Sequence, residues 1–282
     1  MKHLSSTSCL LSVLVLLGGC GGGGRTSGPP PASSPAPPSD PPPHALDIAG
    51  NWQFSTTSVA GMAHATISGS IAQSGSSVSG AAHLDGSKCF DRLTTIGLTG
   101  TLTGSNISLT STSVDGQVTT FTGSISNDAL NGADSALAGT YTIDGGCANG
   151  DHGNVTGIRI PFIANTLNGT FTTSGGETFD VVGDEAQFGT ASSEGSFGIT
   201  GTVTFSTPCF SSGTITPGTF PSGSFIIGTS VALEIETGNG TVTFLGTLNR
   251  DRSEIRGNYT VGGGTCDDTG TAVLVVSSPW DY

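Results

Sequence analysis

The chain has few charged side chains, and basic ones are the rarest. Only 10% of its 282 residues are Asp, Glu, Lys or Arg, and 8 Lys and Arg stand against 21 Asp and Glu, which makes the formal net charge −13 at pH 7. Phosphate backbones and anionic lipid head groups repel so acidic a chain, so we expect no nucleic acid as a partner, and electrostatic docking to a membrane is disfavoured. Because exposed helix faces normally carry Glu, Lys and Arg, the scarcity of charge also argues against a helical fold.

A long hydrophobic run is also absent. A transmembrane helix needs about 20 consecutive apolar residues. The longest apolar stretch here, Cys9–Leu17, is much shorter and is broken by Ser12. It follows the basic Lys2 and precedes small residues, which is the arrangement of a signal peptide rather than of a membrane span.

The end of this segment, Leu17-Gly18-Gly19-Cys20, resembles the lipobox of bacterial lipoproteins. The resemblance implies that residues 1–19 are a lipoprotein signal peptide and that Cys20 is acylated, carries palmitate and anchors the mature protein in a membrane. Gly21, in place of Asp, favours the outer membrane by the sorting rule of enteric bacteria, on its periplasmic or its surface face. An ordinary secretory signal that happens to contain a cysteine is the alternative interpretation.

The lipidated cysteine and a linker occupy residues 20–47. Glycine is followed by a Pro, Ser and Ala run in this segment, and such a composition cannot form a hydrophobic core. Its proline-rich part favours extended polyproline II structure, so we interpret the segment as a spacer.

The remainder of the chain is a duplication, with repeat 1 over residues 48–160 and repeat 2 over residues 161–282. Sequence features of the first repeat return in the second at an offset of about 120 positions, which makes chance a weak explanation. The matched pairs are Ile48–Trp52 with Leu167–Phe171, Cys89-Phe90 with Cys209-Phe210, Val118–Gly123 with Thr241–Gly246, Leu137–Thr142 with Ile255–Thr260, and Cys147 with Cys266.

The duplication also pairs the cysteines. An even number remains in an exported chain once Cys9 and Cys20 are set aside, which favours disulfides. We predict Cys89–Cys147 and Cys209–Cys266, which lie 58 and 57 residues apart in equivalent places. Pairing across the repeats and a zinc site are alternatives; no CxxC pair supports zinc, and the histidines do not cluster with the cysteines.

Each repeat contains about eight strand-like segments, in which apolar residues alternate with polar ones and Gly, Asn, Asp or Ser form the turns. In the first repeat they cover about 50–57, 63–72, 77–83, 93–102, 106–113, 117–126, 137–143 and 153–160. In the second they cover about 168–174, 177–189, 196–205, 212–218, 223–236, 240–249, 254–261 and 269–277.

Consecutive hairpin-connected strands leave unpaired edges unless the sheet closes on itself. Eight strands of this length close into a small barrel that is filled by side chains or holds one small ligand. We therefore predict an all-β protein with two tandem eight-stranded antiparallel up-and-down β-barrels, and a β-sandwich is the alternative.

Gly50-Asn51-Trp52 is similar to the Gly-x-Trp motif that opens lipocalin and avidin barrels, in the calycin group. The resemblance implies a calycin-like shape in which Trp52 closes one end of its barrel, and it implies ligand binding. Phe171 stands in place of this tryptophan in the second repeat. The ligand-contacting residues of those families do not map onto this chain, so the binding residues stay unknown.

No catalytic motif is present: the sequence has no Gly-x-Ser-x-Gly, HExxH or phosphate-binding loop, and no unpaired cysteine beside a histidine. We predict that the protein is not an enzyme and has no catalytic residue, metal ligand or cofactor. Two alternatives remain. His64 and His83 could serve a catalytic or metal-binding role if they face each other across neighbouring strands. The turn carboxylates could bind calcium. These carboxylates are Asp144, Asp151, Asp267 and Asp268.

These observations predict a membrane-anchored bacterial lipoprotein that acts as a non-catalytic binding module, for a small apolar ligand inside a barrel or for a protein partner of the cell envelope. A structural or envelope-interaction protein with solid barrels is the alternative, and an enzyme with an unrecognised site is a third class. Interior Leu, Ile and Phe would make a barrel solid, whereas interior Gly, Ala and Ser would leave a cavity. The abundance of small residues favours cavities.

Overall fold

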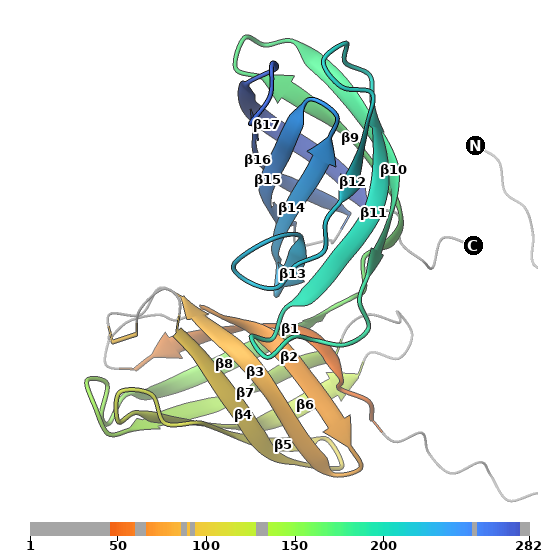
Figure 1. Cartoon of the computed structure of the whole chain (residues 1–282). Helices are drawn as coiled ribbons and strands as arrows, with labels where there is room; N and C mark the ends of the chain where they lie inside the picture. Colours follow the sequence, from red (N-terminus) through yellow and green to blue (C-terminus); the bar gives the residue numbers. More distant parts are fainter. Residues whose placement is uncertain are drawn as a thin grey trace, which may run out of the picture. The chain divides into compact units, whose positions relative to one another are not determined.

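The computed structural model describes residues 46–59, 66–85, 89–90, 94–127, 135–249 and 253–276. The expected signal peptide, Cys20 and nearly all of the linker lie outside these ranges. The regular elements of the described residues are β-strands. Within the same ranges, no helix has the length and hydrophobicity required to cross a membrane. The strands form two closed antiparallel barrels, which confirms the predicted fold and excludes the sandwich (Figure 1).

Barrel 1 consists of eight strands that follow one another around the barrel in sequence order. Each strand pairs with the next, and β1 also pairs with β8, so the sheet has no free edge. The strands are β1 (Gly50–Ser58), β2 (Thr66–Ser74), β3 (Ser77–Asp85), β4 (Thr94–Thr103), β5 (Asn106–Ser111), β6 (Val118–Asn127), β7 (Ser135–Asp144) and β8 (His152–Ile160).

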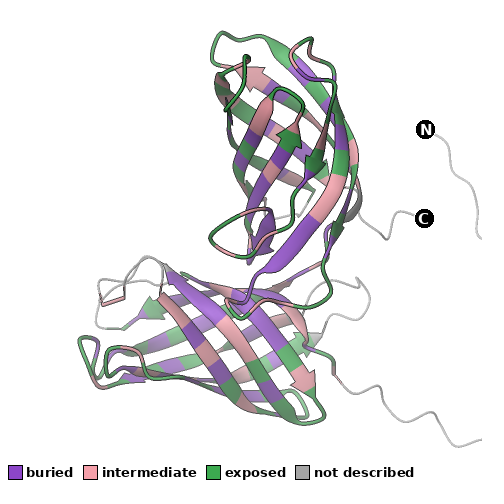
Figure 2. Cartoon of the chain, viewed as in Figure 1, coloured by how far each residue is buried: buried purple, intermediate pink, exposed green. Residues whose placement is uncertain are grey.

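The alternation along each strand decides which side chains point inward. In β5, Ile107 and Leu109 are buried while the residues between them are exposed, and Figure 2 shows the same alternation of buried and exposed positions on the other strands. Glycine occurs where a neighbouring strand leaves no room for a Cβ atom. At Gly69 that atom would lie 2.2 Å from the carbonyl oxygen of Ala81.

Large side chains fill the interior of barrel 1. Trp52 is fully buried, stacks on Phe54 with ring centroids 5.6 Å apart, and donates a hydrogen bond from Nε1 to the Ile48 carbonyl at 2.8 Å. A void of about 10 Å³ remains between Phe54, Ile67, Leu98, Leu109, Phe121, Leu137 and Val155. That space is about what one water molecule needs, so the described side chains around it leave no room for a ligand there.

Barrel 2 repeats this architecture with one strand position interrupted. β12 and β13 both pair with β11 on one side and with β14 on the other, so together they fill a single position. The pairing of β10 with β11 closes the barrel. The strands are β9 (Ala164–Thr173), β10 (Thr178–Gln187), β11 (Phe197–Phe205), β12 (Ser212–Ile215), β13 (Phe225–Ile227), β14 (Ser230–Thr237), β15 (Gly240–Leu248), β16 (Glu254–Gly262) and β17 (Asp268–Val276).

The interruption corrects two strand boundaries predicted in the second repeat. The strand expected over 212–218 ends at Ile215, and the chain leaves the sheet near Pro217, which has no N–H group to donate to a ladder. The strand expected over 223–236 is divided by a turn at Gly228, whose φ of +54° glycine adopts without strain.

The ladder registers also correct the alignment of the two repeats. Ser58 of β1 pairs with Gly153, and Thr173 of β9 pairs with Gly270. Each glycine lies two residues after an aspartate, Asp151 or Asp268, that accepts a hydrogen bond from a tyrosine. Ser58 and Thr173 therefore occupy equivalent positions. Counting back along the two strands, Trp52 corresponds to Leu167 and not to Phe171. The Gly-x-aromatic pattern therefore recurs out of structural register.

Both barrels belong to one unit, His44–Tyr282, and loops of barrel 2 contact strands of barrel 1. Asn51 is 1% exposed; its Nδ2 donates to the carbonyl of Gly228 at 2.9 Å, and its Oδ1 accepts from the N–H of Gly228 at 2.7 Å. Beside it, Gln53 Oε1 accepts from the N–H of Thr229 at 3.1 Å. The Asn51 side chain therefore provides hydrogen-bond partners for both the N–H and the carbonyl of the buried Gly228.

Candidate functional site

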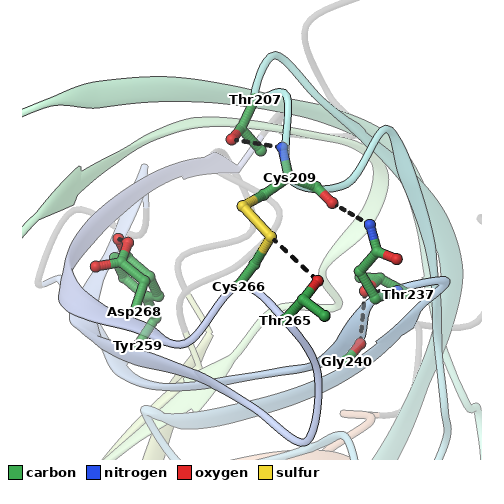
Figure 3. Close-up of a disulfide and its surroundings, with 9 residues drawn as sticks. Thr207, Cys209, Thr237, Gly240, Tyr259, Thr265, Cys266 and Asp268 are labelled. Atoms are coloured by element: carbon green, nitrogen blue, oxygen red, sulfur yellow. Dashed lines mark hydrogen bonds between the residues drawn. A yellow bond between two sulfur atoms is a disulfide. The ribbon is translucent and has the colours of Figure 1, made fainter.

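A disulfide fastens a turn at one end of each barrel. Cys89 is bonded to Cys147, and Cys209 is bonded to Cys266, with Cα–Cα distances of 5.5 and 5.9 Å. In barrel 2 the bond ties the loop after β11 to the turn between β16 and β17 (Figure 3). Each bond closes a loop of more than 50 residues, which is worth about 4 kcal/mol on the chain-entropy model.

An amide side chain supports each disulfide in the same way. Gln117 Nε2 donates to the carbonyl of Cys89 at 3.1 Å, and Asn239 Nδ2 donates to the carbonyl of Cys209. Each of these residues directly precedes a strand, β6 in barrel 1 and β15 in barrel 2, at the equivalent place in the two repeats. The duplication therefore conserves the geometry around the disulfide as well as the cysteines themselves.

A tyrosine–aspartate pair lies close to each disulfide. Tyr141 Oη donates to Asp151 Oδ2 at 3.0 Å, and Tyr259 Oη donates to Asp268 Oδ2 at 2.5 Å. Burial, followed by the aspartate's hydrogen bond and charge, raises the pKa of both tyrosines above the ordinary value, so each remains a proton donor. We did not predict these tyrosines as site residues, although their equivalent positions in the repeats were a signal that could have identified them.

The two aspartates differ in what occupies their second oxygen. In barrel 1, Ser58 Oγ donates to Asp151 Oδ1 at 2.6 Å, and Asp151 is only 6% exposed. In barrel 2, the equivalent hydroxyl, that of Thr173, accepts from the N–H of Glu177 at 3.0 Å instead. Asp268 is half-buried, and its Oδ1 has no hydrogen-bond partner among the described residues.

The segment between the disulfide cysteine and the aspartate differs in length between the two barrels. Three residues separate Cys147 from Asp151, whereas one residue separates Cys266 from Asp268. The longer turn of barrel 1 folds Ala148 into the core, where it is 5% exposed and donates its N–H to Gln117 Oε1 at 2.9 Å. In barrel 2 the single residue between Cys266 and Asp268, Asp267, is exposed.

The open end of barrel 2 holds a depression of about 390 Å³, which we call the barrel 2 mouth. Three carboxylates, several hydroxyls, the disulfide and two phenylalanines line it, and among the described residues the lining includes no Lys, Arg or His. The lining residues are Thr173, Gly175, Glu177, Thr178, Phe179, Ser206, Thr207, Pro208, Cys209, Phe210, Cys266, Asp267 and Asp268. The mouth therefore offers mainly hydrogen-bond acceptors and negative charge.

A second depression, of about 570 Å³, lies on the outer side of the barrel 2 sheet, and we call it the outer groove. Its lining is chemically more uniform than that of the mouth, because threonines and glycines make up most of its described residues and none of them is aromatic. Its lining residues are Thr166, Val182, Gly183, Asp184, Thr202, Val203, Thr204, Ser212, Gly213, Thr214, Glu236 and Gly238.

A buried carboxyl group lies inside barrel 2, away from the mouth. Glu185 is 5% exposed, neither of its carboxylate oxygens has a hydrogen-bond partner among the described residues, and burial raises its pKa to about 7. The Ile163 N–H donates to Gln187 at 3.2 Å, as the Ile48 N–H donates to Gln73 at 2.9 Å in barrel 1. Glu185 therefore occupies the position of a buried isoleucine, Ile71, two residues before that glutamine.

The other residues that we considered for chemistry are described only in part. His64 and Cys20 lie outside the described residues. His83 is buried, and its ring lies 4.5 Å from that of Phe220. Of the four carboxylates considered for calcium, Asp151 and Asp268 accept hydrogen bonds from tyrosines. Among the described ranges, no group of three or more His, Cys, Asp or Glu side chains could hold a metal ion.

Comparisons with known proteins leave the family open. No protein-family model matches the sequence, and no curated protein matches it. Kievitone hydratase from Nectria haematococca is a similar solved structure at 12% identity, covering 83% of this chain and 91% of its own, with a TM-score of 0.21. The agglutinin of Burkholderia oklahomensis covers 80% of this chain and 95% of its own at 12% identity, with a TM-score of 0.18. Scores this low support no conclusion about function.

Proposed function

We propose that this protein is a lipid-anchored, non-catalytic binding module of the bacterial envelope that binds its ligand at the barrel 2 mouth. The observation that carries the proposal is the contrast between the two barrel ends. In the described part of barrel 1, Ala148 packs into the core and the interior void measures about 10 Å³. The mouth of barrel 2, in contrast, holds about 390 Å³ and is cross-linked by the Cys209–Cys266 bond. Small-molecule sites are concave and of roughly this size, about 300–1,000 Å³.

The anchor and the linker supply the location. Acylated Cys20 would hold the chain at the outer membrane, and the proline-rich segment would keep the barrels away from the bilayer surface. Replacement of Cys20 by Ser is expected to release the full chain from the membrane fraction and to remove the mass of the lipid from its N-terminal peptide. Retention of the C20S variant in the membrane would contradict the lipoprotein proposal.

Binding is tested on the full chain, purified from bacterial envelopes and examined by native mass spectrometry. We expect an adduct of defined mass that is lost on denaturation. Thr178→Trp places a large side chain in the mouth and should abolish the adduct. Thr214→Trp places the same side chain in the outer groove and serves as the matched control.

A structural envelope protein with solid barrels is the second candidate. The interior void of about 10 Å³ in barrel 1 favours this candidate, because a space of that size cannot hold an apolar ligand. An adduct-free mass for the wild-type chain, together with cross-links to envelope proteins from exposed strand positions, would select this function over ligand binding.

A further inference from the structure

We propose that the barrel 2 mouth binds a neutral saccharide, with the free oxygen of Asp268 accepting hydrogen bonds from hydroxyls of one sugar ring. This inference rests on the proposed function and names the ligand class of the same site. Its starting point is the difference between the two repeats. Barrel 1 occupies both oxygens of Asp151 with Ser58 and Tyr141, whereas barrel 2 occupies only Oδ2 of Asp268.

The carboxylate of Asp268 is held in place before any ligand arrives. Tyr259, which is 1% exposed, fixes one oxygen through its hydroxyl. The neighbouring disulfide at Cys266 limits movement of the turn. A ligand hydroxyl already forms hydrogen bonds with water, so a hydrogen bond to the protein adds affinity only if it costs little entropy. A preorganised acceptor meets this condition, because it is already fixed before the ligand binds.

The lining selects the class of ligand. Glu177 and Asp267 add two exposed carboxylates to that of Asp268, and Thr178 and Thr207 add hydroxyls. Because its described lining residues include carboxylates and no cationic side chain, the mouth disfavours anions such as phosphates and carboxylates. Its acceptors require a partner that offers many donors, and the hydroxyls of a sugar do so without a charge to desolvate.

Two aromatic rings provide a floor for the apolar face of a sugar ring. Phe179 and Phe210 are 8% and 6% exposed, and their rings meet edge to face with centroids 6.1 Å apart. Both residues belong to the lining of the mouth. A polar rim above an apolar floor matches a pyranose, which carries hydroxyls around its edge and C–H groups on its faces.

The experiment uses the full chain in a detergent without sugar head groups, in the presence of EDTA. The probes are the methyl glycosides of glucose, galactose, mannose and N-acetylglucosamine, followed by saturation-transfer NMR and then by calorimetry. At least one glycoside should bind saturably. Asp268→Asn keeps an acceptor for Tyr259 but removes the charge, and should weaken binding by about tenfold or more, as expected for a hydrogen bond to a charged group.

Matched variants make the result specific. Asp184→Asn removes an exposed carboxylate from the outer groove and should leave the affinity unchanged. Asp267 is an exposed position in the mouth, so Asp267→Asn provides a second test of binding at this site if D268N does not fold. Unchanged affinity in both mouth variants, or a loss in D184N, would overturn the assignment of this site.

Spermidine serves as the competing probe, because a polyamine also offers many donors. Binding of spermidine without binding of any glycoside would overturn the saccharide proposal in favour of a cationic ligand. If no probe binds but the envelope-purified chain still carries an adduct that Thr178→Trp abolishes, the proposed function stands and the ligand class is wrong. If the adduct is absent as well, both proposals fail.

Discussion

The side-chain amide of Asn51 makes two hydrogen bonds with the backbone of Gly228, 177 residues later in the chain. One atom of the amide donates and the other accepts, so the N–H and the carbonyl of Gly228 are both satisfied. No shorter-range signal in the sequence indicates this pairing, which joins a strand of barrel 1 to a turn of barrel 2.

Asn51→Ala should therefore destabilise the protein by about 1–3 kcal/mol, because it leaves buried backbone groups without partners. Urea unfolding of the full chain measures this loss. Asn106→Ala is the control, since Asn106 is exposed and its side chain has no hydrogen bond among the described residues. Equal stability of the N51A and N106A variants would show that the Asn51 contact contributes nothing.

Glu185→Ile should stabilise the protein in a pH-dependent manner. The unfolded carboxyl ionises near pH 4.5, whereas burial holds the folded pKa at about 7. The folded state therefore binds the additional proton between these values, and its stability falls as pH rises through that window, by a total on the order of 3 kcal/mol. The stability difference between E185I and the wild type should be small at pH 4 and largest above pH 7.

Unfolding by urea at a series of pH values tests this expectation. Other carboxylates titrate in both proteins, so their contributions cancel in the difference. A difference that does not change between pH 4 and pH 8 would mean that Glu185 ionises in the folded protein as it does in the unfolded chain.

Removal of either disulfide by a pair of Cys→Ala substitutions should cost about 4 kcal/mol of stability. The two variants should differ in binding. Loss of Cys209–Cys266 frees the rim of the mouth and should abolish the native-mass adduct, whereas loss of Cys89–Cys147 should leave it at a temperature where both variants are folded.

Tyr141→Phe should be more damaging than Tyr259→Phe. In barrel 1 the lost hydroxyl leaves one oxygen of the buried Asp151 without a donor, which costs about 1–3 kcal/mol. In barrel 2 water can replace the hydroxyl at the half-buried Asp268, so the cost should be about 1 kcal/mol or less. Thermal unfolding of the two variants measures the difference, and a larger loss in Y259F would contradict the contrast between the buried Asp151 and the half-buried Asp268.

The sequence alone determined the all-β fold, the tandem barrels and the pairing of the four cysteines in the described residues. These properties depend on local or repeated information: strand alternation has a period of two, turn residues have specific backbone preferences, and a duplication places equivalent cysteines together. Whole segments such as Asn106–Ser111 followed from this pattern because Ile107 and Leu109 alternate with polar residues.

Only the tertiary structure decided what the local pattern leaves open. The structural equivalence of the repeats depends on how each sheet closes: the ladder registers align Trp52 with Leu167 rather than with Phe171, although both residues of the second repeat are buried. The burial of Glu185 follows from that closure. The mouth at Asp268 lies where the segment from the disulfide cysteine to the aspartate is two residues shorter than in barrel 1. Neither feature has a local signature, because burial and hydrogen-bond satisfaction are set by residues far away in the chain.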